Sequence, residues 1–220
     1  MTQSRPGMTQ SRPGMTNNMR IAVYSGSFNP LHIGHLAIIR HMIEEAGFDG
    51  VYLIVSPKNP LKEGISSASG RDRYEAAISA VNRHFPSSPP SSVTEEFEED
   101  MPLCKVKVDD IELNMPEPHY TIRTLDALRE REPDNSFTLV MGADNLADIR
   151  RWRDYRRILK EYGTAVFPRR GFDLNKIKQD LLLEDPAYKI QILEAEMVDI
   201  SSTQIRNAIS SGQDISGCLM

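Results

Sequence analysis

Two histidines stand three residues apart in a short stretch, SGSFNPLHIGH (residues 25–35), that also holds two glycines and a proline. A turn between a strand and a helix uses glycine and proline, but it does not need histidine. If His32 and His35 fall in the first turn of a helix, they share one face of it. Imidazoles placed in this way could donate hydrogen bonds to phosphate oxygens as charge develops on them.

The residues alone leave two other interpretations of this pair open. A zinc site needs a third and a fourth ligand, and apart from His41 no other histidine or cysteine lies nearby in the sequence. Both histidines could also be ordinary, partly buried residues at a helix start. The stretch matches neither the P-loop nor the dinucleotide fingerprint. Gly26 nevertheless lets the backbone approach a phosphate, and the next helix offers free N–H groups to an anion.

A second stretch with anion-binding chemistry is ISSTQIR (residues 200–206). Ser202 and Thr203 can cap a helix and offer hydroxyl and backbone N–H donors. Arg206 follows one turn later and can reach the same anion with its fork of donors. A well-capped surface helix would have the same sequence, so this motif alone does not decide between the two interpretations.

Further polar and aromatic residues follow the ends of predicted strands. Trp152, the only tryptophan, is either a half-buried anchor or a residue that stacks on a ligand. Asp144, just past a glycine, either caps a helix or binds a ribose hydroxyl. Arg169 and Arg170 are either a phosphate-facing patch or simply solvated.

The elements that must position these residues alternate along the chain. Short β-branched or apolar runs predict buried strands at 20–24, 51–55, 136–142 and 164–168. Residues 105–113 are also predicted to be extended. Helical spacing occurs at 34–45, 71–84, 120–130, 154–163, 174–183 and 201–212. This alternation predicts a single α/β domain with a doubly wound, mostly parallel, Rossmann-like sheet. Ligands in such a fold lie at the carboxyl ends of the strands.

The domain is expected to span residues 19–212 of the 220, followed by a tail at 213–220. Residues 1–18 contain the unit MTQSRPG twice and are interpreted as a disordered extension outside the fold. Residues 86–103, rich in proline, serine and acid, are interpreted as a surface insertion whose glutamates are solvated and bind no metal.

Composition excludes several classes of function. The formal net charge of −5 gives no general footprint for nucleic acid or for an anionic membrane. No apolar run approaches 18 residues, so no membrane span is expected. The two cysteines, Cys104 and Cys218, lie far apart, which argues against a disulfide scaffold or a zinc ribbon. They favour a reducing, cytoplasmic location.

Taken together, the H-x-G-H core at 32–35 and the I-S-S-T-x-x-R pattern at 200–206 resemble the nucleotidyltransferase superfamily that joins a nucleoside monophosphate to a phosphate. Within it, HYTIRTLDAL (119–128) and MGADNLADIRRW (141–152) resemble the nicotinate-nucleotide adenylyltransferases. The resemblance runs from about residue 19 to 212, without the insertion. This chain departs from the family pattern G-G-T-F-D-P, having S-G-S-F-N-P at 25–30, and from P-P-H-K, having N-P-L-K at 59–62.

The resemblance implies a role for each matching position. The catalytic residues would be His32, His35 and Arg206. The residues that bind ATP would be Gly26, Ser27, Phe28, Ser202 and Thr203. The residues that bind nicotinate mononucleotide would be Lys62, Arg73, Tyr120, Thr121, Gly142, Asp144 and Trp152.

The implied reaction transfers the adenylyl group of ATP to nicotinate mononucleotide and gives nicotinate adenine dinucleotide and pyrophosphate. Mg²⁺ would arrive bound to ATP, with no metal site built by the protein. The alternatives are nicotinamide mononucleotide or phosphopantetheine as acceptor, or a nucleotide-binding regulator without turnover. The sequence leaves open whether the chain forms a homo-oligomer.

Overall fold

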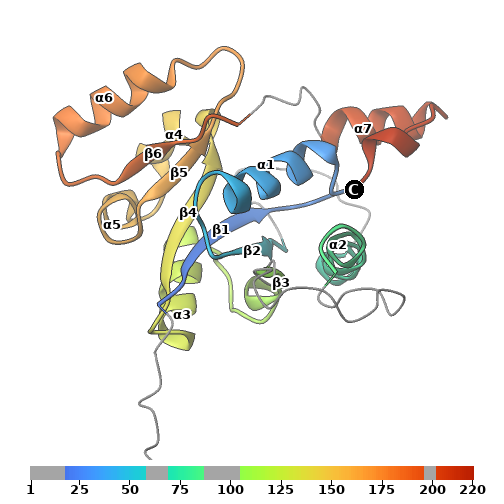
Figure 1. The fold of residues 1–220 in the computed structure, drawn as a ribbon, viewed down its shortest axis with the longest axis horizontal. Coiled ribbons are helices and arrows are strands. Elements are labelled where there is room, and N and C mark those ends of the chain that lie inside the picture. The colour runs from blue at the N-terminus through green and yellow to red at the C-terminus, as the bar shows by residue number, and fades with distance from the viewer. Residues whose placement is uncertain (1–17, 58–68, 87–104, 196–201) are drawn as a thin grey trace, which may run out of the picture.

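A parallel β-sheet crosses the centre of the molecule in the computed structural model, which describes residues 18–57, 69–86, 105–195 and 202–220 (Figure 1). Within these residues the strand order is β3-β2-β1-β4-β5-β6, and every pair of neighbours is parallel. The strands are β1 Arg20–Gly26, β2 Gly50–Val55, β3 Lys105–Asp109, β4 Ser136–Gly142, β5 Thr164–Phe167 and β6 Ile190–Ile192. The predicted parallel sheet is therefore present.

Helices lie in the crossovers between the strands, and α7 follows the last strand. They are α1 Ile33–Glu44, α2 Gly70–His84, α3 Thr121–Arg131, α4 Ala143–Ala147, α5 Tyr155–Arg157, α6 Leu174–Glu184 and α7 Ser202–Ser210. Shorter turns are 3₁₀ at Ile111–Leu113, Ile149–Arg151 and Ser216–Cys218, and π-helical at Ile158–Tyr162. No helix in the described residues is long and apolar enough to cross a membrane.

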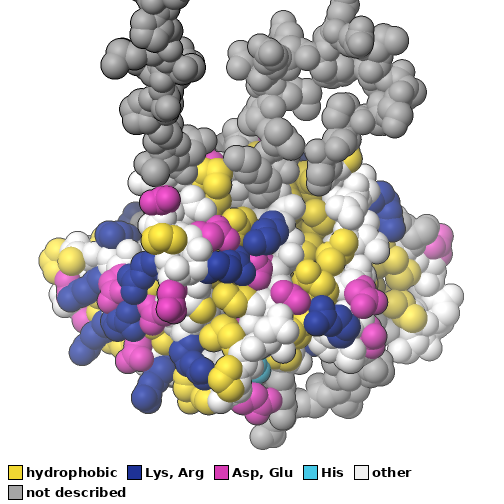
Figure 2. All heavy atoms as spheres, turned by 90° about the horizontal axis from the view of Figure 1, so that it is seen from below, with side chains coloured by type: hydrophobic (Ala, Val, Ile, Leu, Met, Phe, Trp, Pro, Cys, Tyr) yellow, Lys and Arg dark blue, Asp and Glu magenta, His cyan; other side chains and the backbone are white. Residues whose placement is uncertain are grey.

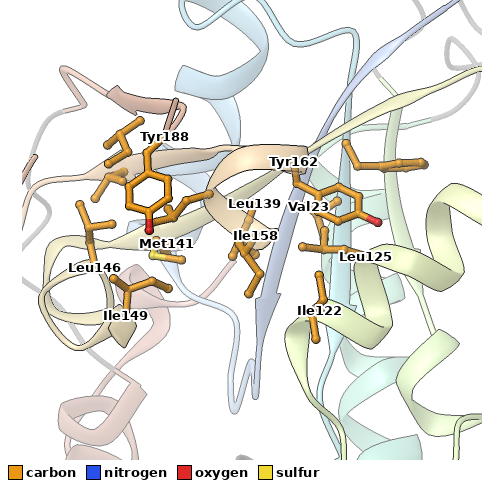
Figure 3. Close-up of a cluster of buried hydrophobic side chains, with 14 of the residues drawn as sticks. Val23, Ile122, Leu125, Leu139, Met141, Leu146, Ile149, Ile158, Tyr162 and Tyr188 are labelled. Carbon is orange, nitrogen blue, oxygen red and sulfur yellow. The ribbon is translucent and has the colours of Figure 1, made fainter. Parts of the chain in front are cut away.

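Both faces of the sheet are buried, which explains the unbroken apolar runs of its strands. Alternate residues of β1 enter two separate cores: Ile21 and Val23 enter one, and Ala22 and Tyr24 the other. The first core receives side chains from α3, α4 and α6 and is shown in Figure 3. The second receives side chains from α1 and α2.

The strand order reverses between β1 and β4. The chain continues from β1 to β2 on one side, and β4 pairs with β1 on the other, so that Ile21 lies between Gly50 and Phe137. The segments that leave β1 and β4 therefore diverge at this point. Such a switch point opens a crevice beyond the carboxyl ends of the strands.

Two predicted elements differ from the structure. The extended segment at 105–113 ends as a strand at Asp109, because the Asp109 carboxylate accepts a hydrogen bond from the Ile111 N–H at 3.0 Å and starts a turn. The continuous helix predicted at 154–163 is α5 followed by a π-helical turn. That turn closes with a hydrogen bond of 2.8 Å from the Gly163 N–H to the Ile158 carbonyl.

The end of the described chain also packs against the domain. Leu219 forms an isolated antiparallel bridge with His32, and Met220 is buried in the second core. The predicted extension at 1–18 falls outside the described residues except for Asn18, and the insertion predicted at 86–103 falls outside them except for Pro86.

Candidate active site

The segment between β1 and α1 is shaped by Phe28. Phe28 has a φ of 43°, in the left-handed region that a bulky residue rarely adopts. Packing holds it there: the ring is buried and lies edge-on to Tyr24 and His35, with centroids 5.5 and 5.3 Å apart. A Cβ on Gly26 would lie 3.0 Å from this ring. Gly26 therefore serves the packing of the loop, in addition to the phosphate approach expected from the sequence.

His32 and His35 lie together at the start of α1, as the i, i+3 spacing predicts. Their ring centroids are 3.7 Å apart. The backbone N–H of His32, the N-cap residue, donates to Nδ1 of His35 at 3.2 Å. Because Nδ1 is the acceptor, the neutral His35 ring carries its proton on Nε2. His35 can thus donate one hydrogen bond from Nε2.

Both imidazoles favour the neutral form. Burial, and then the positive charge of Arg169, lower the pKa of His32 to about 4. Burial lowers the pKa of His35 well below its usual value, with further contributions from His32 and Arg169. At neutral pH the pair therefore consists of two uncharged rings. An approaching phosphate would stabilise their protonated forms.

Arg169, which the sequence left undecided, belongs to this site. It follows β5 and Pro168, and its guanidinium carbon lies 4.9 Å from the centroid of the Phe167 ring. Its Nε is 3.9 Å from the carboxylate of Asp144. The position of an arginine at a strand's carboxyl end was the signal in the sequence. Its charge reaches both histidines, which favours the phosphate-facing interpretation.

Gly142 and Asp144 lie where β4 passes into α4. Gly142 is the N-cap, and Asp144 lies in the first turn of the helix rather than at the cap. A Cβ on Gly142 would collide with the Asp144 carboxylate and would lie 3.2 Å from the Phe167 ring. Asp144 itself is half exposed. Its carboxylate is accessible, and its predicted contact with the mononucleotide stays a prediction.

The second anion-binding motif packs on the first. Arg206 donates from Nη1 to the carbonyl of Asn29 at 2.8 Å and from Nη2 to Thr203 Oγ1 at 2.9 Å. The Ser202 hydroxyl donates to the carbonyl of Pro30 at 3.2 Å. The start of α7 is thereby joined to the segment that carries the histidines, so the two motifs form one site.

Arg73 has a different environment from the one expected. It is 4% exposed, and it donates to the carbonyls of Ser27, Ser56 and Pro57 at 2.6, 2.9 and 2.9 Å. These bonds hold together the segments that leave β1 and β2. Its predicted contact with the mononucleotide remains untested, and in this structure its terminal donors serve the backbone. Lys62 lies outside the described residues.

Beneath these segments lies a polar network that the sequence analysis missed. The Glu112 carboxylate, 3% exposed, accepts hydrogen bonds from Ser56 Oγ at 2.6 Å and Thr124 Oγ1 at 2.8 Å. The hydroxyl oxygens of Ser56 and Ser25 are 3.1 Å apart. The network joins the end of β1 to α3. Its one visible signal is the acidic residue within the apolar turn Ile111–Leu113.

Tyr120 and Trp152, both predicted to bind the mononucleotide, line a common hollow of about 540 Å³. Tyr120 is the N-cap of α3, which begins at Thr121, and Trp152 follows the 3₁₀ turn after α4. Trp152 is half-buried and packs against the first core, and its indole N–H has no hydrogen-bond partner among the described residues. The other residues lining the hollow are Arg150, Arg151, Arg153, Asp154, Tyr155, Arg156 and Arg157.

The hollow lies in a strongly charged part of the surface. Figure 2 shows basic side chains interleaved with acidic ones on the left, the side on which Figure 1 places α5 and α6. Within the described part of the chain, no group of three or more His, Cys, Asp or Glu residues is suited to hold a metal ion. The polar groups that the site presents include arginine side chains, two neutral histidines and the start of α1.

Comparison with known proteins matches this arrangement. The model of the cytidylyltransferase-like family matches residues 23–208. Two relatives named probable nicotinate-nucleotide adenylyltransferase, from Flavobacterium johnsoniae and Flavobacterium psychrophilum, are each 36% identical over 197 residues, 90% of this chain and 90% of each relative. The structure of Plasmodium falciparum nicotinic acid mononucleotide adenylyltransferase complexed with NaAD superposes with a TM-score of 0.66 at 19% identity, covering 90% of this chain and 88% of that one. This last likeness confirms the fold.

Proposed function

We propose, because this chain belongs to the cytidylyltransferase-like family and within it to the nicotinate-nucleotide adenylyltransferases, that it transfers the adenylyl group of ATP to nicotinate mononucleotide. The products are nicotinate adenine dinucleotide and pyrophosphate, an intermediate and a by-product of NAD biosynthesis. The observation that carries the proposal is the hydrogen bond from Arg206 to Asn29, because it unites the two anion-binding motifs in one site.

The reaction needs no general base. A phosphate oxygen of the mononucleotide, already an anion at neutral pH, attacks the α-phosphorus of ATP in line. One P–O bond forms as the bond between the α-phosphorus and the bridging oxygen breaks, and pyrophosphate leaves with the electron pair. Catalysis then consists of positioning the reactants and stabilising the developing charge.

The chain's own residues supply those two effects. His35 donates from Nε2 toward the transferring phosphate. The ring of His32 lies against the ring of His35. Arg206 and the start of α7 hold the outer phosphates of ATP. Arg169, whose positive charge lowers the pKa of both histidines, offsets negative charge from the side of β5. Mg²⁺ would be held by the phosphates of ATP rather than by the protein, and it would supply screening of their negative charge.

The acceptor's ring would occupy the hollow between Tyr120 and Trp152, where aromatic stacking favours a flat heterocycle. We assign to Asp144, in the first turn of α4, the role of accepting hydrogen bonds from a ribose. These assignments are supported by the joint position of Tyr120 and Trp152 in one hollow.

A cytoplasmic location is also part of the proposal. It rests on the scarcity of cysteine, since Cys218 is free and half-buried and a reducing compartment keeps such thiols reduced. Assembly into a homo-oligomer is compatible with the reaction, which uses residues of one chain in the mechanism above.

The test is pyrophosphate release with Mg-ATP and, separately, nicotinate mononucleotide, nicotinamide mononucleotide and phosphopantetheine. We expect fast release with the nicotinate form. Comparable pyrophosphate release with nicotinamide mononucleotide would support adenylyl transfer but contradict the assignment of nicotinate mononucleotide as the preferred acceptor. Binding of ATP without pyrophosphate release in the presence of any of the three acceptors would instead identify a regulator.

A further inference from the structure

The arginines that line the hollow differ in how closely their charge is neutralised. Three of the five make short ion pairs: Arg150 and Arg156 with Glu184 at 3.0 and 3.4 Å, and Arg157 with Asp126 at 3.0 Å and Glu161 at 2.8 Å. These pairs join α5 and the 3₁₀ turn before it to α3 and α6. Their guanidinium groups are committed to the wall of the hollow.

The other two arginines flank Trp152 and are less constrained. Arg151 lies 3.8 Å from Asp148 and Arg153 lies 3.6 Å from Asp154, and all four side chains are more than half exposed. Exposed pairs at such distances are weak and exchange readily with other partners. Of the two, Arg153 also lies over the ring of Tyr120, with 5.9 Å between its guanidinium carbon and the ring centroid.

We propose that Arg153 is the residue that selects an acidic pyridine mononucleotide over the corresponding amide. The inference rests on the proposed function, which puts the acceptor's ring between Tyr120 and Trp152. A carboxylate and a carboxamide have nearly the same shape, so a pocket separates them by charge rather than by size. The guanidinium over Tyr120 lies at the edge of that ring site and can take the carboxylate in place of Asp154.

The chemistry of the guanidinium suits this task. Its planar fork matches a carboxylate with two parallel hydrogen bonds, whereas a carboxamide presents one acceptor and one competing donor. Tyr120 fixes the approach of the guanidinium through its ring face. The competing source of selectivity is the N-terminus of α3, whose backbone N–H groups beside Tyr120 also favour an anion.

The experiment compares kcat/KM for nicotinate and nicotinamide mononucleotide in the wild-type protein, Arg153→Gln and the matched control Arg151→Gln. The control removes the same charge from the same wall without touching Tyr120. We expect Arg153→Gln to lower the acid-to-amide ratio roughly tenfold through a higher KM for the acid, because glutamine keeps one hydrogen-bond donor group but loses the second donor and the charge. Arg151→Gln should change both substrates by the same factor.

The outcomes separate this inference from the proposed function. A ratio in Arg153→Gln within about twofold of the wild-type ratio would assign selectivity to the start of α3 and overturn the proposal. If the acid-to-amide ratio falls equally in Arg151→Gln, the summed positive charge of the arginines causes the selectivity, and the assignment to Arg153 is overturned as well. Lack of turnover by the wild-type protein with either mononucleotide would overturn the proposed function itself, and the inference with it.

Discussion

Arg206 and Asn29 are 177 positions apart in the sequence, yet the guanidinium of one donates to the carbonyl of the other at 2.8 Å. The bond holds the start of α7 against the segment that presents His32 and His35. The other terminal nitrogen of Arg206 donates to Thr203 Oγ1 at 2.9 Å, within the motif that is assigned to the phosphates of ATP. Anion binding and loop geometry therefore depend on the same side chain.

Replacing Arg206 should affect activity far more than stability. Arg206→Lys keeps the charge but loses the fork, and we expect a fall in kcat/KM of roughly 100-fold with little change in the melting temperature. Pyrophosphate release and thermal unfolding measure the two effects. Arg40→Lys, at an exposed arginine of α1, is the control and should retain wild-type activity. Equal activity in both variants would contradict the assigned role.

Two substitutions at His35 distinguish the roles of its two ring nitrogens. In His35→Asn the amide oxygen can still accept from the His32 N–H, whereas the donor at Nε2 is lost. In His35→Gln the amide can reach the Nε2 position. We expect kcat to fall about 100-fold in the asparagine variant and less in the glutamine variant, while KM changes little in both. If KM rather than kcat rises in the asparagine variant, His35 only binds substrate.

The depressed pKa of His32 makes stability depend on pH. The folded protein holds this ring neutral down to about pH 4, whereas the unfolded chain takes up a proton near its ordinary value of 6.5. The unfolded state thus binds more protons between these values, so stability rises with pH through this window and is lost as the pH falls through it. We expect a loss of roughly 1–3 kcal/mol from pH 7 to 4, after allowance for partial screening by solvent.

Urea unfolding at a series of pH values measures that loss. The variant His32→Gln has no group that titrates there, so its stability should fall less over the same interval. If the free energy of unfolding of the two proteins falls in parallel with pH, groups other than His32 cause the pH dependence.

Arg169 should affect the pKa of both histidines. Its positive charge adds to burial in lowering the pKa of His32 and His35. In Arg169→Gln we expect the pKa of His32 to rise but to stay below 6.5, because burial remains the larger cause. We also expect kcat/KM to fall about tenfold through the lost charge at the phosphates. Titration by NMR gives the first quantity, and an unmoved His32 resonance would place Arg169 outside the site.

The buried Glu112 network should contribute to stability in a measurable way. Thr124→Val removes one of the two hydroxyl donors to the carboxylate and leaves it half satisfied. We expect a loss of about 1–3 kcal/mol in the free energy of unfolding. Ser79→Ala, which removes an exposed hydroxyl bonded to its own helix, is the control and should cost less than about 0.5 kcal/mol. Equal losses would show that the buried carboxylate does not need Thr124.

By itself the sequence determined the features that depend on neighbouring residues. The alternation of apolar runs and helical patterns led to the parallel sheet, and the three-residue spacing of His32 and His35 placed both on one turn of α1. The two terminal motifs identified the family. Each of these is a local pattern, because side-chain periodicity is set by the backbone geometry of a single element.

Only the tertiary structure decided how those elements share their ends. Parallel strands are joined by long crossovers, so residues that meet at one edge of the sheet are far apart in the chain. Three features arise in this way: the effect of Arg169 on the pKa of the histidines, the bonds of Arg73 to two loops and the burial of Glu112. The packing of Phe28 over Gly26 required a fold as well, since buried neighbours hold its positive φ. Local pattern therefore identified the reacting groups, and long-range packing set their protonation and their partners.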